Sequence, residues 1–291
     1  MRYKLVLSYL GHKFNGWTQG EIKSDTVCAV LEKALKQIGK QDIQLHGSSR
    51  TDIGVHAIKT TAHFDFQRRH RITNELQEDY EPEQMKRMIN SLKSSDYVKV
   101  LEVHQVPATY NARRDAVERY YMYRILQVHS KEDAAYRHPL LMDRVWFLDT
   151  REGQKRLDVA KMREILPHLT SGRMDLSSLC RRAERLKRYH GDEHVVRRIN
   201  SIEVEELECN SNPEITCSEW NKEIRIHVKA PSFIHNQVRI LAGLLMAVGR
   251  GDLLPSSIPD LIADKKRHSK VMTAPASGLY LMNVKEKSDL T

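Results

Sequence analysis

The chain opens with Tyr3-Lys4-Leu5-Val6-Leu7-Ser8-Tyr9, in which every second side chain is large and apolar. This period of two predicts a β-strand with one face turned toward a core. Between Ser24 and Lys40 the apolar residues instead return every three or four positions, up to Gly39. That spacing predicts a helix that ends near the glycine. The chain therefore begins with a strand followed by a helix.

Outward from this start, strand and helix patterns continue to alternate. We predict strands beginning at Ile43 and over 60–66 and 98–106, and a helix opened by Pro82, which completes the β-α-β-β-α-β order of a ferredoxin-like unit. After Pro107 the pattern partly recurs, with strands expected at 120–127, 144–148, 199–207, 224–228 and 279–284, and helices at 157–169 and 232–249. The basic segment 181–198 is only weakly periodic, and we predict a loop there.

The composition is that of a globular protein with an excess of positive charge. The 291 residues are 40% hydrophobic and 29% charged, and 47 Lys and Arg against 38 Asp and Glu leave a formal charge of +9. Such an excess fits a polyanionic partner, because neutralising phosphates releases condensed counterions. Charge that serves solubility alone is the alternative interpretation. We favour a nucleic acid as the partner, and the composition does not distinguish DNA from RNA.

Several other classes are disfavoured. The apolar stretch from Ile240 to Val248 is too short for a membrane span, and the N-terminus lacks the pattern of a secretory leader. The four cysteines are widely spaced with no C-x-x-C pair, which argues against a structural zinc site or a disulfide framework. We expect a soluble intracellular protein, in the cytoplasm or the mitochondrion, with no metal, and we interpret His56 and His63 as structural.

One polar stretch between two predicted strands carries candidate chemistry: Ser48-Ser49-Arg50-Thr51-Asp52-Ile53-Gly54-Val55-His56-Ala57. A loop at the end of a sheet holds Arg50 and Asp52 within reach of a ligand, and Gly54 permits a left-handed backbone. The nearby guanidinium favours the charged, nucleophilic form of the Asp52 carboxyl. Taken alone, however, these residues fit a capped turn with a solvated arginine at least as well.

The string from Arg50 to Ala57 resembles the signature of the TruA-type tRNA pseudouridine synthase family, R-T-D-x-G-V-H-A. Further segments are similar to that family's motifs, appear in the same order, and cover roughly residues 3 to 284. They are Tyr9 to Trp17, Thr26-Val27 with Leu31-Glu32, Val106-Pro107 with Asn111-Ala112-Arg113, Arg119 to Tyr123, Val196 to Ile199, Phe233 to Arg239, and Ala274 to Leu281.

The chain also departs from the family pattern, as in a divergent, eukaryotic-like or organellar branch. Ser49 replaces the usual glycine, Asn111 stands where histidine is common, and Gln19 is displaced by one position from the usual G-W-Q. Leu176 and Leu179 replace two phenylalanines. These departures bear on the choice of substrate position rather than on the reaction.

The resemblance implies a cofactor-free isomerase that converts uridine to pseudouridine in the tRNA anticodon stem-loop, in the region of tRNA positions 38 to 40. It implies that Asp52 is the nucleophile, attacking either C1′ of the ribose or C6 of the base. Tyr121 would pack on the uracil, Arg239 would pair with Asp52, and Arg50 would help to hold a flipped nucleotide. By analogy the partners are tRNA and a second copy of the chain in a homodimer.

Other basic residues are assigned more broadly. Arg113 and Arg114 are expected to grip phosphates, which position RNA without reading its sequence. For Arg68, Arg69 and Arg71, and for the run Lys265-Lys266-Arg267, a solvated surface and RNA contact both stay open. The apolar neighbours of Arg239 predict that its guanidinium is mostly buried.

Two alternatives of a different class remain. The chain could be a catalytically inactive RNA-binding or chaperone member of the same fold, or a hydrolase that cuts N-glycosidic bonds with a carboxylate. Retention of Asp52, Tyr121 and Arg239 argues against a pure binder, and the lack of a second well-placed carboxylate in the signature argues against the hydrolase.

The predicted fold class is α+β, with two tandem ferredoxin-like-derived units whose sheets form one central mixed, mostly antiparallel sheet with a catalytic cleft. We predict a ferredoxin-like domain over residues 1–108, which carries the Asp52 loop. Residues 109–291 are predicted to form a second α+β domain that completes the cleft.

Overall fold

The computed structural model describes residues 1–18, 25–70, 72–73, 75–128, 138–149, 156–181, 183–208 and 222–290. By its internal contacts the chain forms two compact units. Unit 1 comprises Met1–Arg119 with Tyr280–Thr291, and unit 2 comprises Tyr120–Leu279. Because units defined by contacts need not fold separately, the domain boundary at residue 108 stays a prediction.

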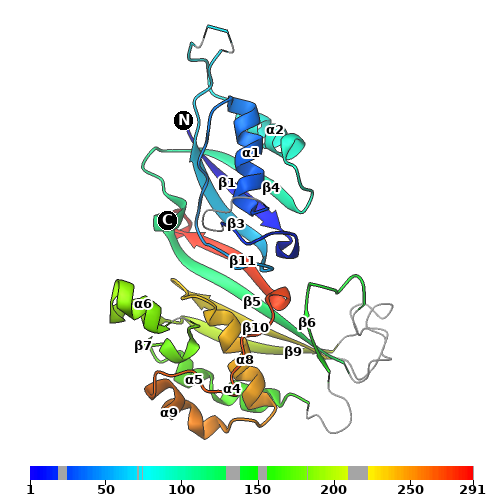
Figure 1. The fold of residues 1–291 in the computed structure, drawn as a ribbon, viewed down its shortest axis with the longest axis vertical. Helices are drawn as coiled ribbons and strands as arrows, with labels where there is room; N and C mark the ends of the chain where they lie inside the picture. The colour runs from blue at the N-terminus through cyan, green and yellow to red at the C-terminus, as the bar shows by residue number, and fades with distance from the viewer. Residues whose placement is uncertain are drawn as a thin grey trace. The chain divides into compact units, whose positions relative to one another are not determined.

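The sheet of unit 1 is built around its first strand. Strand β1 (Arg2–Tyr9) pairs antiparallel with both β3 (His56–Asp65) and β4 (Val98–Val106). Tyr3, Leu5 and Leu7 are fully buried, as their period of two predicts. Helices α1 (Val27–Gly39) and α2 (Pro82–Leu92) lie beside each other on this sheet (Figure 1). Their buried faces supply the other half of the core.

The second edge of β3 is shared by two strands. The short β2 (His46–Gly47) pairs antiparallel with its later half, and β11 (Leu279–Glu286) pairs parallel with its start, Tyr280 opposite His56. The strand expected from Ile43 is therefore shorter than predicted. Leu45 is buried and its N–H donates to the Glu32 carboxylate at 3.0 Å, so it is taken out of the ladder by a side chain of α1.

Unit 2 contains both strands and helices. Strand β10 (Lys222–Ala230) lies between β5 (Ala116–Val128) and β9 (Ser201–Glu208). It pairs antiparallel with β9, and β6 (Trp146–Asp149) pairs parallel with β5. The apolar helix α8 (Gln237–Gly249) is buried along nearly its whole length and contacts α4 (Val159–Glu164). Both units thus combine helices with a mostly antiparallel sheet that has one parallel pair, which confirms the predicted α+β class.

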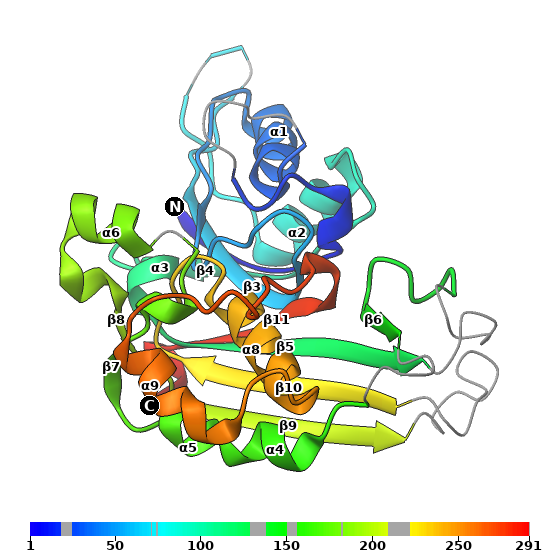
Figure 2. The ribbon, with the colours of Figure 1, turned by 60° about the horizontal axis from the view of Figure 1, so that its bottom comes forward.

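Short elements connect these layers. They are the helices α3 (Ala112–Asp115), α5 (Leu166–Leu169), α6 (Ala183–His190) and α9 (Ile258–Ala263), the paired strands β7 (Arg173–Asp175) and β8 (Val196–Arg198), and the 3-10 turns η1 (Gly11–Lys13), η2 (Ser177–Leu179), η3 (Asp192–Val195), η5 (Pro255–Ser257), η6 (Ala276–Gly278) and η7 (Lys287–Leu290). Figure 2 shows the elements of unit 2 from a second side. None of the helices in the described ranges is long and apolar enough to cross a membrane.

Three local predictions were wrong. The helix expected over 157–169 is divided into α4 and α5, because Pro167 has no N–H to donate to the preceding turn. The loop expected over 181–198 contains α6 and β8, which contact η2, η3 and β7. Helix α8 begins at Gln237 rather than at residue 232, because Asn236 has a left-handed backbone, φ 61°.

Candidate active site

Asp52 lies in a tight turn between β2 and β3. The Val55 N–H donates to the Asp52 carbonyl at 3.2 Å, and Gly54 has a φ of 82°, a conformation that favours glycine. The Asp52 side chain is half-buried. A carboxylate is thus presented on a defined turn, at the end of a sheet, with access to solvent.

The segment from Tyr9 to Trp17 clamps this turn from one side. The Trp17 N–H donates to the Thr51 carbonyl at 3.2 Å, and the Tyr9 and Thr51 hydroxyls lie 2.8 Å apart in a buried contact. The Gly11 N–H donates to Nδ1 of His56 at 3.1 Å, so closely that a Cβ on Gly11 would collide with the Val55 carbonyl. Two motifs separated in sequence therefore form one rigid support for Asp52.

Arg119 supports the same turn from another side. Its Nη2 donates to the Ser48 carbonyl at 2.9 Å, and its Nε donates to Oγ of Ser49 at 3.2 Å. In the sequence, Arg119 was part of a family-like segment, but no role was predicted for it. The signal was present in Ser49, since a hydroxyl in place of the usual glycine provides the acceptor.

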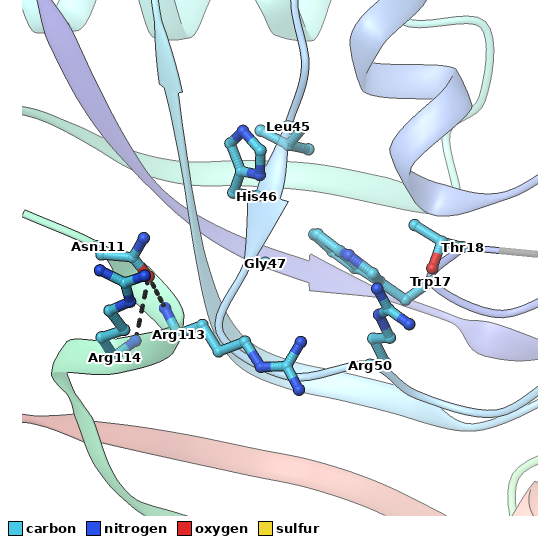
Figure 3. Close-up of a pocket in the computed structure, with 9 residues that line it drawn as sticks. All are labelled: Trp17, Thr18, Leu45, His46, Gly47, Arg50, Asn111, Arg113 and Arg114. Carbon is cyan, nitrogen blue, oxygen red and sulfur yellow. Dashed lines mark hydrogen bonds between the residues drawn. The ribbon is translucent and has the colours of Figure 1, made fainter. Parts of the chain in front are cut away.

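A pocket of about 290 Å³ opens beside the turn, within unit 1 (Figure 3). Arg50 and Arg113 point into it from opposite sides, and Trp17, His46 and Arg114 contribute to its lining. Asp52 is not among its lining residues. Three guanidinium groups around one cavity attract an anion such as a phosphate.

The two arginines of α3 are held by its cap. Oδ1 of Asn111 accepts from the N–H groups of Arg113 and Arg114, both at 3.1 Å (Figure 3), and the Asp115 carboxylate accepts from the Asn111 N–H at 2.8 Å. Asparagine is a favoured residue at a helix start for this reason. The departure from the usual histidine at this position therefore fixes the turn that presents Arg113 and Arg114.

His63 holds the first residue of α3 by a hydrogen bond. Its Nδ1 accepts from the Ala112 N–H at 3.2 Å, and its ring stacks on that of His46 with 5.0 Å between ring centres. Burial, and then the positive charges of His46 and Arg2, lower the pKa of His63 from 6.5 to about 4. A neutral ring is what the contact requires, because a backbone N–H has to find an unprotonated nitrogen.

Tyr121 and Arg239 lie in unit 2, each in a defined setting. Tyr121 is buried on β5 and meets the Phe233 ring edge-on, with 5.1 Å between ring centres. The Arg239 Nε donates to the Ala274 carbonyl at 2.7 Å, and the Ala274 N–H donates back to the Arg239 carbonyl at 3.1 Å. Nη1 of Arg239 donates to Oδ1 of Asn236 at 3.0 Å. The segments Phe233 to Arg239 and Ala274 to Leu281, which resemble the last two family motifs, are thus hydrogen-bonded to each other.

Arg239 lies in the first turn of α8 and is mostly buried, as its apolar neighbours predict.

Metal and thiol chemistry have few candidates in the described part of the chain. There, no group of three His, Cys, Asp or Glu side chains is arranged to hold a metal ion. Cys28 and Cys180 are buried, and burial raises the pKa of the Cys28 thiol above its usual range. Cys209 and Cys217 lie outside the described residues.

Comparisons with known proteins identify the family of the chain. The model of the tRNA pseudouridine synthase family matches residues 5–113 and 168–285. Arg50, Asp52 and Arg113 fall within the first range and Arg239 within the second, while Arg114 and Tyr121 lie between the two. The chain is 31% identical over 287 residues to "tRNA pseudouridine synthase A" of Anaplasma marginale (strain Florida), covering 98% of this chain and 99% of the relative.

Relatives of the same name from other bacteria show similar values. That of Wolbachia sp. subsp. Drosophila simulans (strain wRi) is 31% identical, covering 98% of this chain and 99% of the relative. That of Parvibaculum lavamentivorans is 30% identical, covering 97% of this chain and 98% of the relative. Fold, site and similarity over nearly the full length define an RNA-modifying enzyme of the isomerase class. The chain belongs to the tRNA pseudouridine synthase family.

Proposed function

We propose that this protein converts uridine to pseudouridine in the anticodon stem-loop of tRNA, with Asp52 as nucleophile and without a cofactor. The observation that carries the proposal is the Asp52 turn, which is clamped by Tyr9, Gly11, Trp17 and Arg119 in a chain that matches the family over nearly its full length. A carboxylate held this firmly on a half-exposed turn suits attack on a bound nucleotide.

The reaction is a rearrangement within one nucleotide. The N1–C1′ bond breaks, the uracil rotates, and a C5–C1′ bond forms, while C5 loses a proton and N1 gains one. No atoms are lost and no electrons leave the substrate, so the chemistry calls for a nucleophile, a holder for the detached base, and a group that moves the proton. Asp52 takes the first role, with attack at C1′ or at C6.

The other site residues are assigned to holding the substrate. Tyr121 lies edge-on to Phe233, and we propose that the uracil ring packs against the Tyr121 ring. Arg239 is held by Ala274 and Asn236, and we propose that its charge keeps the Asp52 carboxylate ionised in the assembled site. Arg50 projects into a basic pocket beside the Asp52 turn, where it stabilises a nucleotide that has been flipped from its stack.

The RNA is bound through its phosphates by Arg113 and Arg114, both exposed on α3. We also propose that tRNA is its substrate, as the names of its relatives state for those proteins. We further propose that the enzyme acts as a homodimer. The alternative of an inactive RNA-binding member predicts tRNA binding without turnover, and the hydrolase alternative predicts release of free uracil.

One assay separates these possibilities. Uridine-labelled tRNA is incubated with the enzyme and the products are resolved as pseudouridine, free uracil or unchanged uridine. We expect pseudouridine from the wild type, and a loss of at least about a thousandfold in Asp52→Asn, because removal of a nucleophile costs most of the catalysis. Asp42→Asn is the matched control, since Asp42 is exposed in the same unit and forms an ion pair with the exposed side chain of Lys36.

The RNA affinity of Asp52→Asn should stay close to that of the wild type, because the change is nearly isosteric on an accessible turn. Residual activity within about tenfold of the wild type would remove Asp52 from the nucleophile's role. Free uracil as the main product would show that the enzyme is a hydrolase and not an isomerase.

A further inference from the structure

Two basic segments that lie far apart in the sequence come together in unit 2. One runs through β7, η2, α6 and β8, and the other follows α9. Both α6 and α9 contact η2, and Figures 1 and 2 show α6, β7 and α9 in the same part of the unit. We call the basic side chains gathered there the Asp175 cluster. Its members are Arg173, Arg181, Lys187, Arg197, Lys265 and Arg267.

The cluster is named after the carboxylate at its centre. Lys187 Nζ lies 3.6 Å from Oδ2 of Asp175, and Lys265 Nζ lies 3.5 Å from the same oxygen. Asp175 also accepts from the backbone N–H of Ser177 at 2.9 Å. One carboxylate oxygen is therefore shared by two lysines from different segments, and it neutralises at most one of them.

Two of the arginines donate hydrogen bonds to backbone carbonyls. Nη1 of Arg197 donates to the carbonyls of Glu193 and Val196 at 3.1 and 2.8 Å, and Nε of Arg267 donates to the Val271 carbonyl at 2.8 Å. Arg173 and Arg181 are exposed. Among the described side chains, Asp175 is the carboxylate that forms ion pairs with this cluster. Within the described part of the chain, the positive charges of the cluster therefore outnumber the carboxylates paired with them.

The cluster also brings like charges close to one another. Burial, and then the charge of Arg181, lower the pKa of Arg267. Burial, and then the charge of Arg173, lower the pKa of Arg197. Repulsion of this kind is unfavourable in the free protein and is relieved when an anion binds between the charges. A surface that only serves solubility has no need to collect such pairs.

The arrangement favours an extended anion over a small one. The charges are carried by a two-stranded ribbon, the end of a helix and a loop, and several of them are exposed, so the surface is broad rather than enclosed. The phosphodiester backbone of an RNA presents regularly spaced charges that match a broad surface of arginines and lysines. A small metabolite would instead require an enclosed site.

We propose that the Asp175 cluster is a second RNA-binding surface, which contacts phosphates of the substrate RNA separately from the pocket lined by Arg50, Arg113 and Arg114. The identification of that RNA as tRNA rests on the proposed function. The cluster holds the RNA without taking part in the chemical step, so it governs affinity and not turnover at saturation.

The test compares two triple variants of the full chain. Arg173→Gln/Arg181→Gln/Lys265→Gln removes three exposed charges of the cluster, and Lys33→Gln/Lys40→Gln/Lys99→Gln removes three exposed charges of unit 1 as a matched control. Binding to tRNA is measured over a range of salt concentrations, and pseudouridine formation is measured over a range of tRNA concentrations.

The cluster variant should bind tRNA more weakly, and its log–log salt slope should fall by about 2 to 3, or about 0.7 to 0.9 for each lost phosphate contact. KM should rise while kcat stays the same, and the control should match the wild type. Unchanged binding in the cluster variant, or equal weakening in both variants, would overturn the proposal. If the triple variant unfolds at a lower temperature, the single variant Arg181→Gln at this exposed position should still show a smaller loss of the same kind.

The two proposals fail in different ways. If the wild type forms pseudouridine and the cluster variant binds tRNA normally, the cluster proposal is wrong and the proposed function stands. If the wild type binds tRNA through the cluster but forms no pseudouridine, the proposed function is wrong and the second surface stands.

Discussion

The contact between His63 and α3 makes a quantitative prediction about acid stability. His63 is 3% exposed, its Nδ1 accepts the Ala112 N–H, and its pKa is lowered from 6.5 to about 4. In the unfolded chain the ring binds a proton near its ordinary pKa, while in the folded protein it stays neutral. The unfolded state therefore binds more protons between these two values, and the folded state loses stability as the pH falls through this range.

The size of the effect follows from the two pKa values. Each unit of difference corresponds to about 1.4 kcal/mol, so between pH 7 and pH 5 this one residue should lower the free energy of unfolding by about 2 kcal/mol. The loss begins below the unfolded pKa and is complete once the pH is below the folded pKa. Protonation also removes the acceptor for Ala112, so α3 and its two arginines should loosen in the same range.

The measurement is urea unfolding at pH 7 and at pH 5, followed by fluorescence, for the wild type and His63→Gln. Glutamine cannot take up the proton, so its free energy of unfolding should depend less on pH than that of the wild type, by about 2 kcal/mol over this interval. His104→Gln is the control, because His104 is exposed on β4 of the same unit. Equal pH dependence in the wild type and His63→Gln would refute the argument.

Three further predictions concern the active site. Arg113→Ala and Arg114→Ala should weaken binding to all tRNAs alike and lower the log–log salt slope by about 0.7 to 0.9 each; a change confined to the choice of site would mean that they read bases. Activity should persist in EDTA, and a loss that is reversed by a divalent ion, with enzyme and RNA both folded, would contradict this. In a double-mutant cycle on thermal unfolding, Asp52→Ala and Arg239→Met should couple by more than about 0.5 kcal/mol, and additive losses would show that the two side chains do not meet.

The sequence by itself determined the elements whose signals are local. The strand at Arg2–Tyr9, the helix opened by Pro82 and the strand Val98–Val106 were predicted at or within a residue or so of their observed starts, because a period of two or of 3.6 is visible within a few turns of chain. The Asp52 loop was singled out by its resemblance to a family signature whose residues are consecutive. Its turn follows from Gly54 and from the neighbouring strand.

Only the tertiary structure decided the contacts between distant residues. The pairing of β11 with β3, the support of Ser49 by Arg119 and the anchoring of Ala112 by His63 join segments that no local period connects. Helix α8 begins only after a left-handed Asn236, a backbone detail that the apolar residues of this segment do not reveal.

The Asp175 cluster shows most clearly the difference between what the sequence determines and what the tertiary structure decides. From the sequence, the segment 181–198 and the run Lys265-Lys266-Arg267 were two separate stretches of positive charge, each of which could be solvated surface. In the folded chain one carboxylate oxygen of Asp175 lies within ion-pair distance of a lysine from each stretch. Charge is a property of each residue and can be read one position at a time, whereas the field of several charges depends on distances that only the packing of unit 2 establishes.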